Sequence, residues 1–291
     1  MLQSAAVASP AAPERRPPPR EAGDTPLSPA YARLAAVFPT LRVHESDTPH
    51  TGDGWVTAAE LARGGAALEE FLAWDRAQLL RDHDRPARPD VVASFGLHRY
   101  AWPACLLVTL PWFLYRRVPS IPVDAVSYQR RLGQLSVRVD EFACLPGDPA
   151  AGDPRARIVP DEEALRVAVR TAIATHLEPV LHAFRPLIRR GARALWGMAT
   201  DEITEGLWYM GHLLGAEERA RAEVGRLLPG STPPYVQGAG FRTLTPRTGE
   251  PLTTRDRASC CLYYTLRPED TCVTCPRTSD AERIERLTDP G

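Results

Sequence analysis

Apolar side chains recur with helical spacing along much of the chain. The pattern predicts a first helix from Ser28-Pro29, because serine caps a helix N-terminus and proline suits its first turn. Thr57-Ala58-Ala59-Glu60 matches a capping box and opens a second helix, which Gly64-Gly65 weakens near its start. A third apolar stretch runs from Pro89 to Arg117. We expect its two internal prolines to kink or split it.

The second half of the chain has clearer helical periodicity. A long apolar stripe begins after Asp161 and continues to Phe184, with carboxylates in its first turn, where the helix dipole favours negative charge. A further helix is expected from Pro186 to Leu214, and another from Glu217 to Leu228. From Ser231 up to the clustered cysteines the chain is rich in Thr, Pro and Gly, and we expect it to be irregular.

Strand signals are few. The clearest is the alternation of Leu135, Val137 and Val139 with polar residues. The pattern therefore predicts a helix-rich α+β fold, with a mostly helical core, a few strands and a small irregular C-terminal module that contains a cysteine cluster.

Gly, Pro and Asp residues indicate where the chain divides. The stretch 146–160 is the best internal boundary. The first 26 residues are rich in Ala, Pro and Arg and lack aromatic residues, so we expect them to be disordered. The predicted organisation is a disordered tail at 1–26, a helical part with a short strand region at 27–145, a linker at 146–160, a helical part at 161–240 and the cysteine-containing module at 241–291.

Charge composition excludes several classes of function. Basic and acidic residues number 35 and 36, which leaves no overall field to attract nucleic acid or an anionic membrane. Every cation is an arginine, so Schiff-base catalysis by lysine and a Walker-type phosphate lysine are excluded. The longest apolar run, Ala101 to Tyr115, is too short for a bilayer span. Without an export signal we expect a cytoplasmic protein, although peripheral contact with a membrane stays open.

Six cysteines are unevenly placed. Cys105 and Cys144 read as small buried hydrophobic residues. The other four fall within sixteen residues near the C-terminus, as Cys260, Cys261, Cys272 and Cys275. Clustered thiols in a reducing compartment are more often metal ligands or redox groups than disulfides.

The four clustered cysteines have the form C-C-x10-C-x2-C. Four thiolates can hold one zinc ion or an iron-sulfur cluster. Zinc sites usually contain spaced cysteine pairs, whereas Cys260-Cys261 has no spacer. A two-iron cluster is wider than one ion and accommodates adjacent cysteines better, and plant-type ferredoxin spacing does not fit. The spacing favours an iron-sulfur cluster and leaves structural zinc, disulfides and free thiols as alternatives.

The cysteine segment resembles the FhuF-type ferric-siderophore reductases, whose members end in a [2Fe-2S] domain with this cysteine arrangement. A looser likeness extends upstream through Glu178-Pro179-Val180 and Arg193-Ala194-Leu195-Trp196-Gly197. The resemblance implies that Cys260, Cys261, Cys272 and Cys275 bind a [2Fe-2S] cluster. It also implies an oxidoreductase that reduces siderophore-bound Fe(III) to Fe(II) and so releases the iron. A [2Fe-2S] electron carrier or redox sensor for another partner, and a structural zinc protein, are the alternative functions.

Electrons would come from a separate protein. The chain has no G-x-G-x-x-G after a strand, so NAD and FAD binding are unsupported. We expect a ferredoxin, flavodoxin or flavin reductase as the donor. Cations beside the cluster would favour its more negative reduced form; the candidates for this tuning of the potential are Arg255, Arg257, Arg267 and Arg277.

The siderophore, expected to be of the hydroxamate type, needs a groove lined by aromatic rings and arginines. Candidates on one helix are Arg189, Arg190, Arg193 and Trp196, with Trp208 and Tyr209 as further candidates. His176 and His182 lie six residues apart and have no expected metal role. We interpret Asp201, Glu202 and Glu205 as a hydrated helix face.

Overall fold

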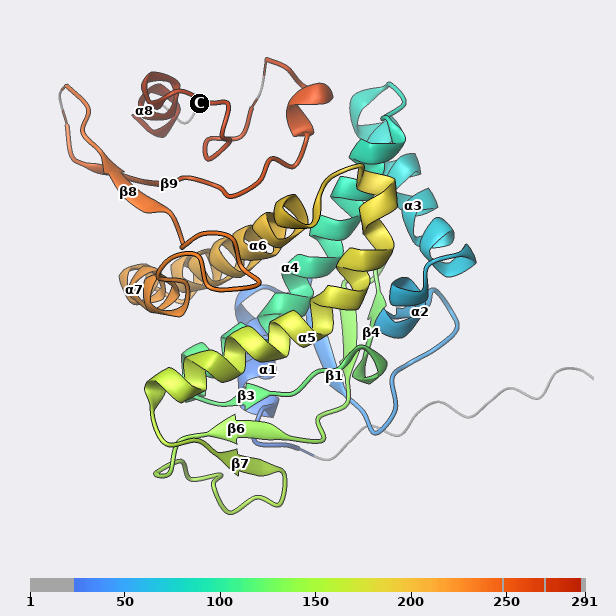
Figure 1. Ribbon diagram of the computed structural model, residues 1–291, viewed down its shortest axis with the longest axis vertical. Coiled ribbons are helices and arrows are strands. Elements are labelled where there is room, and N and C mark those ends of the chain that lie inside the picture. Colours follow the sequence, from blue (N-terminus) through green and yellow to red (C-terminus); the bar gives the residue numbers. More distant parts are fainter. Residues whose placement is uncertain (1–23, 248, 270, 289–291) are drawn as a thin grey trace, which may run out of the picture.

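Helices dominate the computed structural model, which describes residues 24–247, 249–269 and 271–288 (Figure 1). The predicted helix-rich α+β fold is confirmed. Residues 1–23 of the predicted disordered tail lie outside the described residues. Of the three tail residues that are described, Thr25 is buried.

The helices include two long ones, of 27 residues each, that form much of the centre of the molecule. In chain order the helices are α1 (Ser28–Val37), α2 (Ala58–Arg63), α3 (Ala66–His83), α4 (Pro89–Tyr115), α5 (Glu162–Ile188), α6 (Ala192–Leu213), α7 (Glu217–Leu227) and α8 (Asp280–Thr288), with short 3-10 turns η1 (Val123–Ala125) and η2 (Tyr263–Thr265).

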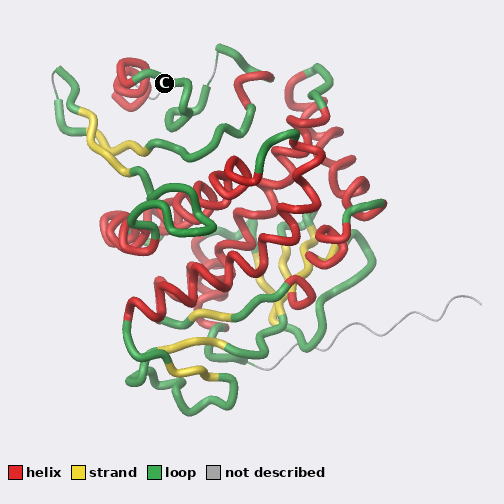
Figure 2. The backbone as a smooth tube through the Cα atoms, in the orientation of Figure 1, coloured by secondary structure: helices red, strands yellow, loops and turns green. Residues whose placement is uncertain are grey.

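The strands are short and form separate small sheets (Figure 2). A four-stranded sheet has the order β1-β5-β4-β2, in which β1 and β5 are parallel, and a three-stranded sheet has the order β3-β6-β7. β8 and β9 form an antiparallel hairpin. The bounds are β1 (Arg42–Glu45), β2 (Trp55–Thr57), β3 (Val118–Pro119), β4 (Val126–Gln129), β5 (Gln134–Val137), β6 (Phe142–Cys144), β7 (Ala156–Ile158), β8 (Phe241–Leu244) and β9 (Leu252–Arg255).

Local signals in the sequence explain several boundaries. Thr57 and Glu60 form the capping box at the start of α2. The glycine pair ends that helix, because Gly64 and Gly65 have φ angles of 72° and 68°, and α3 begins directly afterwards. The prolines at 103 and 111 do not split α4, which runs continuously from Pro89 to Tyr115.

A single hydrophobic core connects the two halves of the chain. α4 packs against both α5 and α6, and buried side chains from all three helices belong to one cluster. Cys105 and Cys144 are buried in it, as expected. β7 lies within the predicted linker 146–160 and pairs in parallel with β6.

α4 is the one described helix long and apolar enough to span a membrane, but 78% of its most apolar window is buried, as in the core helix of a globular protein.

The C-terminal segment folds back over α6 (Figure 1). Its hairpin, β8–β9, lies in the region that we expected to be irregular, so that expectation is wrong for residues 241–255. Arg221 of α7 donates to the Thr253 hydroxyl at 2.8 Å, which ties the hairpin to the helices. Gly197 allows the chain that follows the hairpin to approach α6 closely, because a Cβ at this position would lie 3.1 Å from the carbonyl oxygen of Ala258.

Candidate metal centre

The four clustered cysteines lie on one loop between β9 and α8. The Cys275 amide donates to the carbonyl of Cys272 at 2.9 Å, which closes the C-x2-C segment into a turn. Cys275 is buried, and Cys260, Cys261 and Cys272 are half-buried. The loop therefore holds its thiols at the boundary between protein interior and solvent.

The thiols interact with one another. The Cys272 thiol donates a hydrogen bond to Cys261, and this bond lowers the pKa of Cys261 to about 5. The same bond, followed by burial, raises the pKa of Cys272. Burial raises the pKa of Cys260, and negative charge on Cys261 and Cys275 acts in the same direction. All four sulfur atoms are thus close enough to influence each other's ionisation.

Backbone amides also point at the sulfurs. Leu262 N–H donates to Cys260 Sγ at 3.4 Å, and Arg277 N–H donates to Cys275 Sγ at 3.5 Å. Leu262 has a φ of 70°, in the left-handed region that non-glycine residues seldom adopt. Hydrogen bonds of this kind stabilise thiolate and help to set the potential of a bound cluster.

This donor set fits a [2Fe-2S] cluster. In the described part of the chain, no three His, Cys, Asp or Glu side chains surround a position suited to one metal ion. The thiols instead form a hydrogen-bonded pair, Cys261 with Cys272, with Cys260 and Cys275 close to it. Two iron ions take four thiolates over a wider site than one ion requires. The cysteine loop can therefore hold a two-iron cluster through Cys260, Cys261, Cys272 and Cys275.

A buried carboxylate fixes the cysteine loop to α6. Asp201 accepts hydrogen bonds from the Ala258 amide at 2.9 Å, and from the Ser259 amide and hydroxyl at 2.8 and 2.9 Å. It also forms an ion pair with Arg255, and both side chains are almost completely buried. Removing one partner of such a buried pair costs about 3–5 kcal/mol, because the other charge is left uncompensated. Asp201 therefore holds the backbone immediately before the first two cysteines.

The expectation of a hydrated helix face at Asp201, Glu202 and Glu205 is wrong for the first two. Asp201 is 0% exposed and Glu202 is 5% exposed, because the C-terminal segment and α4 cover this face of α6. Glu205 is half-buried, and burial raises the pKa of its carboxyl. The amphipathic pattern of α6 could not reveal this, since the covering segment lies more than fifty residues away in sequence.

The four arginines considered for tuning have different surroundings. Arg257 is 12% exposed, lies 3.6 Å from Asp201, and interacts electrostatically with Cys261. Arg255 is buried and paired with Asp201 and Glu205. The other two are exposed: Arg267 contacts His83 at 3.4 Å and Arg277 lies over the ring of Tyr264. In the described structure, the side chain of Arg257 interacts electrostatically with a cluster thiol, whereas Arg277 reaches Cys275 through its backbone amide.

The structure separates the residues considered for siderophore binding. Arg190 is half-buried and donates to the carbonyl of Cys260 at 3.1 Å, so it lies against the cysteine loop. Arg189 and Arg193 are exposed at the α5–α6 corner. Trp196 packs edge-on against Tyr235. Trp208 donates to Glu217 at 2.8 Å and packs against Phe241; Tyr209 is exposed and packs against Phe38 and Trp102.

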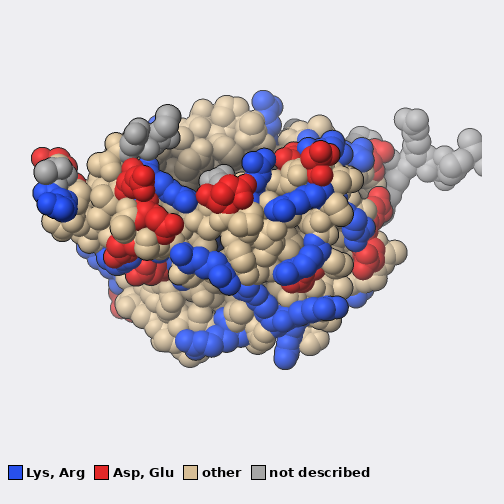
Figure 3. All heavy atoms as spheres, turned by 90° about the horizontal axis from the view of Figure 1, so that it is seen from above, with Lys and Arg blue, Asp and Glu red and all other residues tan. Residues whose placement is uncertain are grey.

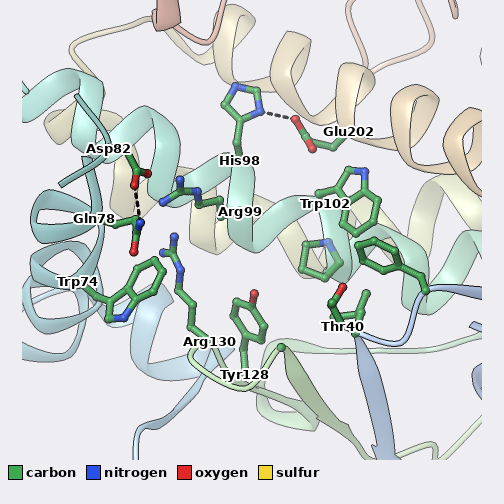
Figure 4. Close-up of a pocket in the computed structure, with 14 residues that line it drawn as sticks. Thr40, Trp74, Gln78, Asp82, His98, Arg99, Trp102, Tyr128, Arg130 and Glu202 are labelled. Atoms are coloured by element: carbon green, nitrogen blue, oxygen red, sulfur yellow. Dashed lines mark hydrogen bonds and ion pairs between the residues drawn. The ribbon is translucent and has the colours of Figure 1, made fainter. Parts of the chain in front are cut away.

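A cavity of about 570 Å³, which no pattern in the sequence indicated, is formed by α3, α4, α6 and β4 (Figure 4). Aromatic rings, two arginines and the hydrogen-bonded pair His98–Glu202 line it. Its residues come from distant parts of the chain, so no spacing motif connects them. Their aromatic and arginine composition is nevertheless the one expected of a siderophore site.

The cysteine segment has a counterpart among known families. Residues 257–277 match the family model of the FhuF 2Fe-2S C-terminal domain. A comparison with curated proteins finds no match. The matched residues include all four clustered cysteines and Arg257. Residues 257–277 are therefore similar to the FhuF 2Fe-2S C-terminal domain, in agreement with the resemblance of the cysteine segment to that family.

Proposed function

We propose that this protein reduces siderophore-bound Fe(III) to Fe(II) in the cytoplasm. The observation that carries this proposal is the set of four neighbouring thiols on a loop that matches the FhuF 2Fe-2S domain. When bound there, a [2Fe-2S] group supplies one electron at a time. Siderophore oxygens are hard ligands that suit Fe(III) and hold the softer Fe(II) far more weakly. One electron added to the chelated iron therefore releases it without breaking a bond of the siderophore.

The protein's own residues position and tune the site. Cys260, Cys261, Cys272 and Cys275 supply thiolates, and Asp201 keeps the preceding backbone fixed against α6. Arg257 places a positive charge beside Cys261. The amides of Leu262 and Arg277 donate to sulfur. Together these groups favour added negative charge on the thiolate site, which an electron-accepting centre requires.

An external one-electron donor would restore the reduced state. Figure 3 views the molecule from the side of the C-terminal segment and shows Arg side chains across the centre and lower part of this face, with clusters of Asp and Glu beside them. Exposed arginines in or beside that segment include Arg85, Arg189, Arg193, Arg267 and Arg277. An acidic donor such as a ferredoxin or flavodoxin would be attracted to this face.

The test is a single-turnover reaction. Dithionite-reduced protein is mixed anaerobically with a ferric hydroxamate in a stopped-flow instrument, with a ferrous chelator present. We expect the cluster to reoxidise while the ferrous complex forms, with one ferrous ion per cluster oxidised. The matched control is the double variant Cys272→Ser, Cys275→Ser, which should lack both the visible chromophore and the reaction.

The alternative functions give different results in this experiment. Reoxidation by unrelated acceptors, but not by ferric siderophores, would favour an electron carrier or redox sensor. A colourless protein that contains zinc would favour a structural metal site. Either result would contradict the proposed reductase.

A further inference from the structure

One end of the cavity between α3, α4, α6 and β4 is held rigid by a buried carboxylate. Asp75 of α3 is 0% exposed and accepts two hydrogen bonds from Arg130, which follows β4. Arg99 of α4 donates to the same carboxylate at 2.6 Å. Arg130 also lies over the rings of Trp74 and Phe71, at 4.3 and 5.1 Å from their centroids. Two guanidinium groups and an indole are therefore preorganised on this side of the cavity.

Arg99 is the more accessible of the two cations. A third of its side chain is exposed, compared with 8% for Arg130. Figure 4 shows Arg99 and Arg130 directed toward one another, between Gln78 and Asp82 on one side and Tyr128 on the other. Arg99 can thus donate to a ligand while Arg130 keeps its contact with Asp75.

The opposite end of the cavity is lined by His98 and Trp102 of α4 and by Glu202 of α6. Trp102 packs edge-on against Phe38 there, with ring centroids 5.6 Å apart. His98 pairs through Nδ1 with Glu202 of α6, and its Nε2 is buried without a hydrogen-bond partner (Figure 4). An unsatisfied buried nitrogen is costly, and a ligand or bound water in the cavity would satisfy it.

Helix α4 connects this end of the cavity with the cysteine loop. Ser94 donates through its hydroxyl to the carbonyl of Cys261 at 3.1 Å. His98 lies one helical turn further along, a rise of about 6 Å. Glu202, the partner of His98, also lies 4.0 Å from the guanidinium of Arg257, which precedes the first cysteines of the loop. A ligand against His98 would thus lie within a short distance of the thiols.

The charges around the cavity favour a ligand of low net charge. Its lining includes the carboxylates of Asp82, which accepts from Gln78, and Glu202, which pairs with His98, as well as Arg99 and Arg130. Both arginines already share the carboxylate of Asp75. A multiply anionic chelate would meet two carboxylates with no free excess of positive charge. A neutral chelate with amide oxygens could instead pack on Trp74 and Trp102 and accept hydrogen bonds from Arg99.

We propose that this cavity is the binding site for a neutral ferric hydroxamate chelate, held between Trp74 and Trp102 and oriented by Arg99, with His98 on the side nearest the cysteine loop. The proposal rests on the proposed function and places its substrate away from the α5–α6 corner, where Arg189 and Arg193 lie. The chelate forms no covalent bond with the protein at this site.

Binding of a redox-inert analogue tests the location separately from the reaction. The probe is the gallium(III) complex of ferrichrome, a neutral hydroxamate siderophore, titrated into the full-length protein and followed by tryptophan fluorescence and calorimetry. We expect Arg99→Gln and Trp74→Leu each to weaken binding at least tenfold. Arg193→Gln, the matched control at the other candidate site, should leave binding unchanged. The gallium complex of the strongly anionic catecholate enterobactin should bind at least tenfold more weakly than that of ferrichrome.

Several outcomes would overturn the proposed site. If Arg193→Gln weakens binding and Arg99→Gln does not, the chelate binds at the α5–α6 corner. Equal binding by all variants, or tighter binding of the catecholate complex, would also contradict the proposal.

Far-ultraviolet circular dichroism verifies that each variant is folded, and Asp75 keeps its partner Arg130 in Arg99→Gln. If the wild-type protein reduces ferric hydroxamates but does not bind the gallium probe, the cavity is excluded while the proposed function stands. If the wild-type protein binds the gallium probe but does not reduce ferric hydroxamates, the cavity stands as a binding site while the proposed function is excluded.

Discussion

At the scale of single residues, buried charge around the cysteine loop distinguishes Arg257 from the other arginines near it. Arg257 is 12% exposed and lies between Asp201 and the thiol of Cys261. Arg277 is exposed and contacts the ring and hydroxyl of Tyr264. Because a charge acts more strongly where solvent is excluded, Arg257 should influence a bound cluster more than Arg277 does.

Arg257→Gln is expected to lower the midpoint potential of the bound cluster by about 60 mV, equivalent to about 1.4 kcal/mol for a one-electron couple. The reason is that removing a positive charge disfavours the more negative reduced state. A spectroelectrochemical titration measures the shift, with Arg277→Gln as the control that should move the potential much less. An unchanged or raised potential in Arg257→Gln would contradict the tuning role.

A second residue-scale prediction concerns His176. Burial lowers its pKa to about 4; Nδ1 of its ring donates to the Ile121 carbonyl at 2.7 Å, and Nε2 accepts from the Tyr100 hydroxyl at 2.8 Å. In the unfolded chain His176 is protonated below about pH 6.5, whereas in the native state it is protonated only below about pH 4. Stability is therefore lost as the pH falls below 6.5, by roughly 2 kcal/mol at pH 5.

Chemical denaturation at pH 7 and pH 5 tests this dependence. In His176→Gln the loss of unfolding free energy between these pH values should be smaller by roughly 2 kcal/mol than in the wild type. His182→Gln is the matched control, because His182 is exposed on the same helix, and it should keep the wild-type difference. If His176→Gln keeps that difference too, His176 is not the group responsible.

At the scale of elements, the contact between α6 and the C-terminal segment determines where the cysteine loop lies. Gly197 permits that contact, since a Cβ there would also lie 3.3 Å from the Cβ of Ala258. Ser259 and Cys260 follow immediately in sequence. The closeness of α6 to the loop thus depends on a residue without a side chain.

Gly197→Val should displace the loop and reduce the visible absorbance per chain by at least half, with a loss of about 1–3 kcal/mol in unfolding free energy from overpacking. Gly225→Val is the matched control, because a Cβ at Gly225 in α7 meets nothing within 4 Å. Both substitutions place the same β-branched residue in a helix. Equal absorbance in the two variants would show that the α6 contact does not position the cysteines.

Elements with local signals were predictable from the sequence. Short stretches of sequence contain the capping box of α2, the alternation at β5 and the spacing of the four cysteines, so each can be read without knowing the tertiary structure. The hairpin β8–β9 was not predictable, because its Thr- and Pro-rich sequence resembles a loop. Asp201 and the cavity were also missed, since their partners come from segments that only tertiary folding brings together.

At the scale of the whole molecule, the helical core joins two candidate sites. The cysteine loop lies against α6 and contacts α4 through Ser94, while the cavity opens between α3, α4, α6 and β4 on the other side of His98. Helices α4 and α6 therefore contribute to both. This arrangement brings the candidate substrate site and the candidate [2Fe-2S] site together on the same two helices.

The most direct test of the account is electron paramagnetic resonance of the anaerobically reduced protein, recorded before and after one equivalent of ferric hydroxamate is added. We predict the signal of a reduced [2Fe-2S] cluster before addition, its loss afterwards, and a matching amount of Fe(II). Reduced protein that gives no such signal, or a signal that persists with the ferric chelate present, would contradict the account.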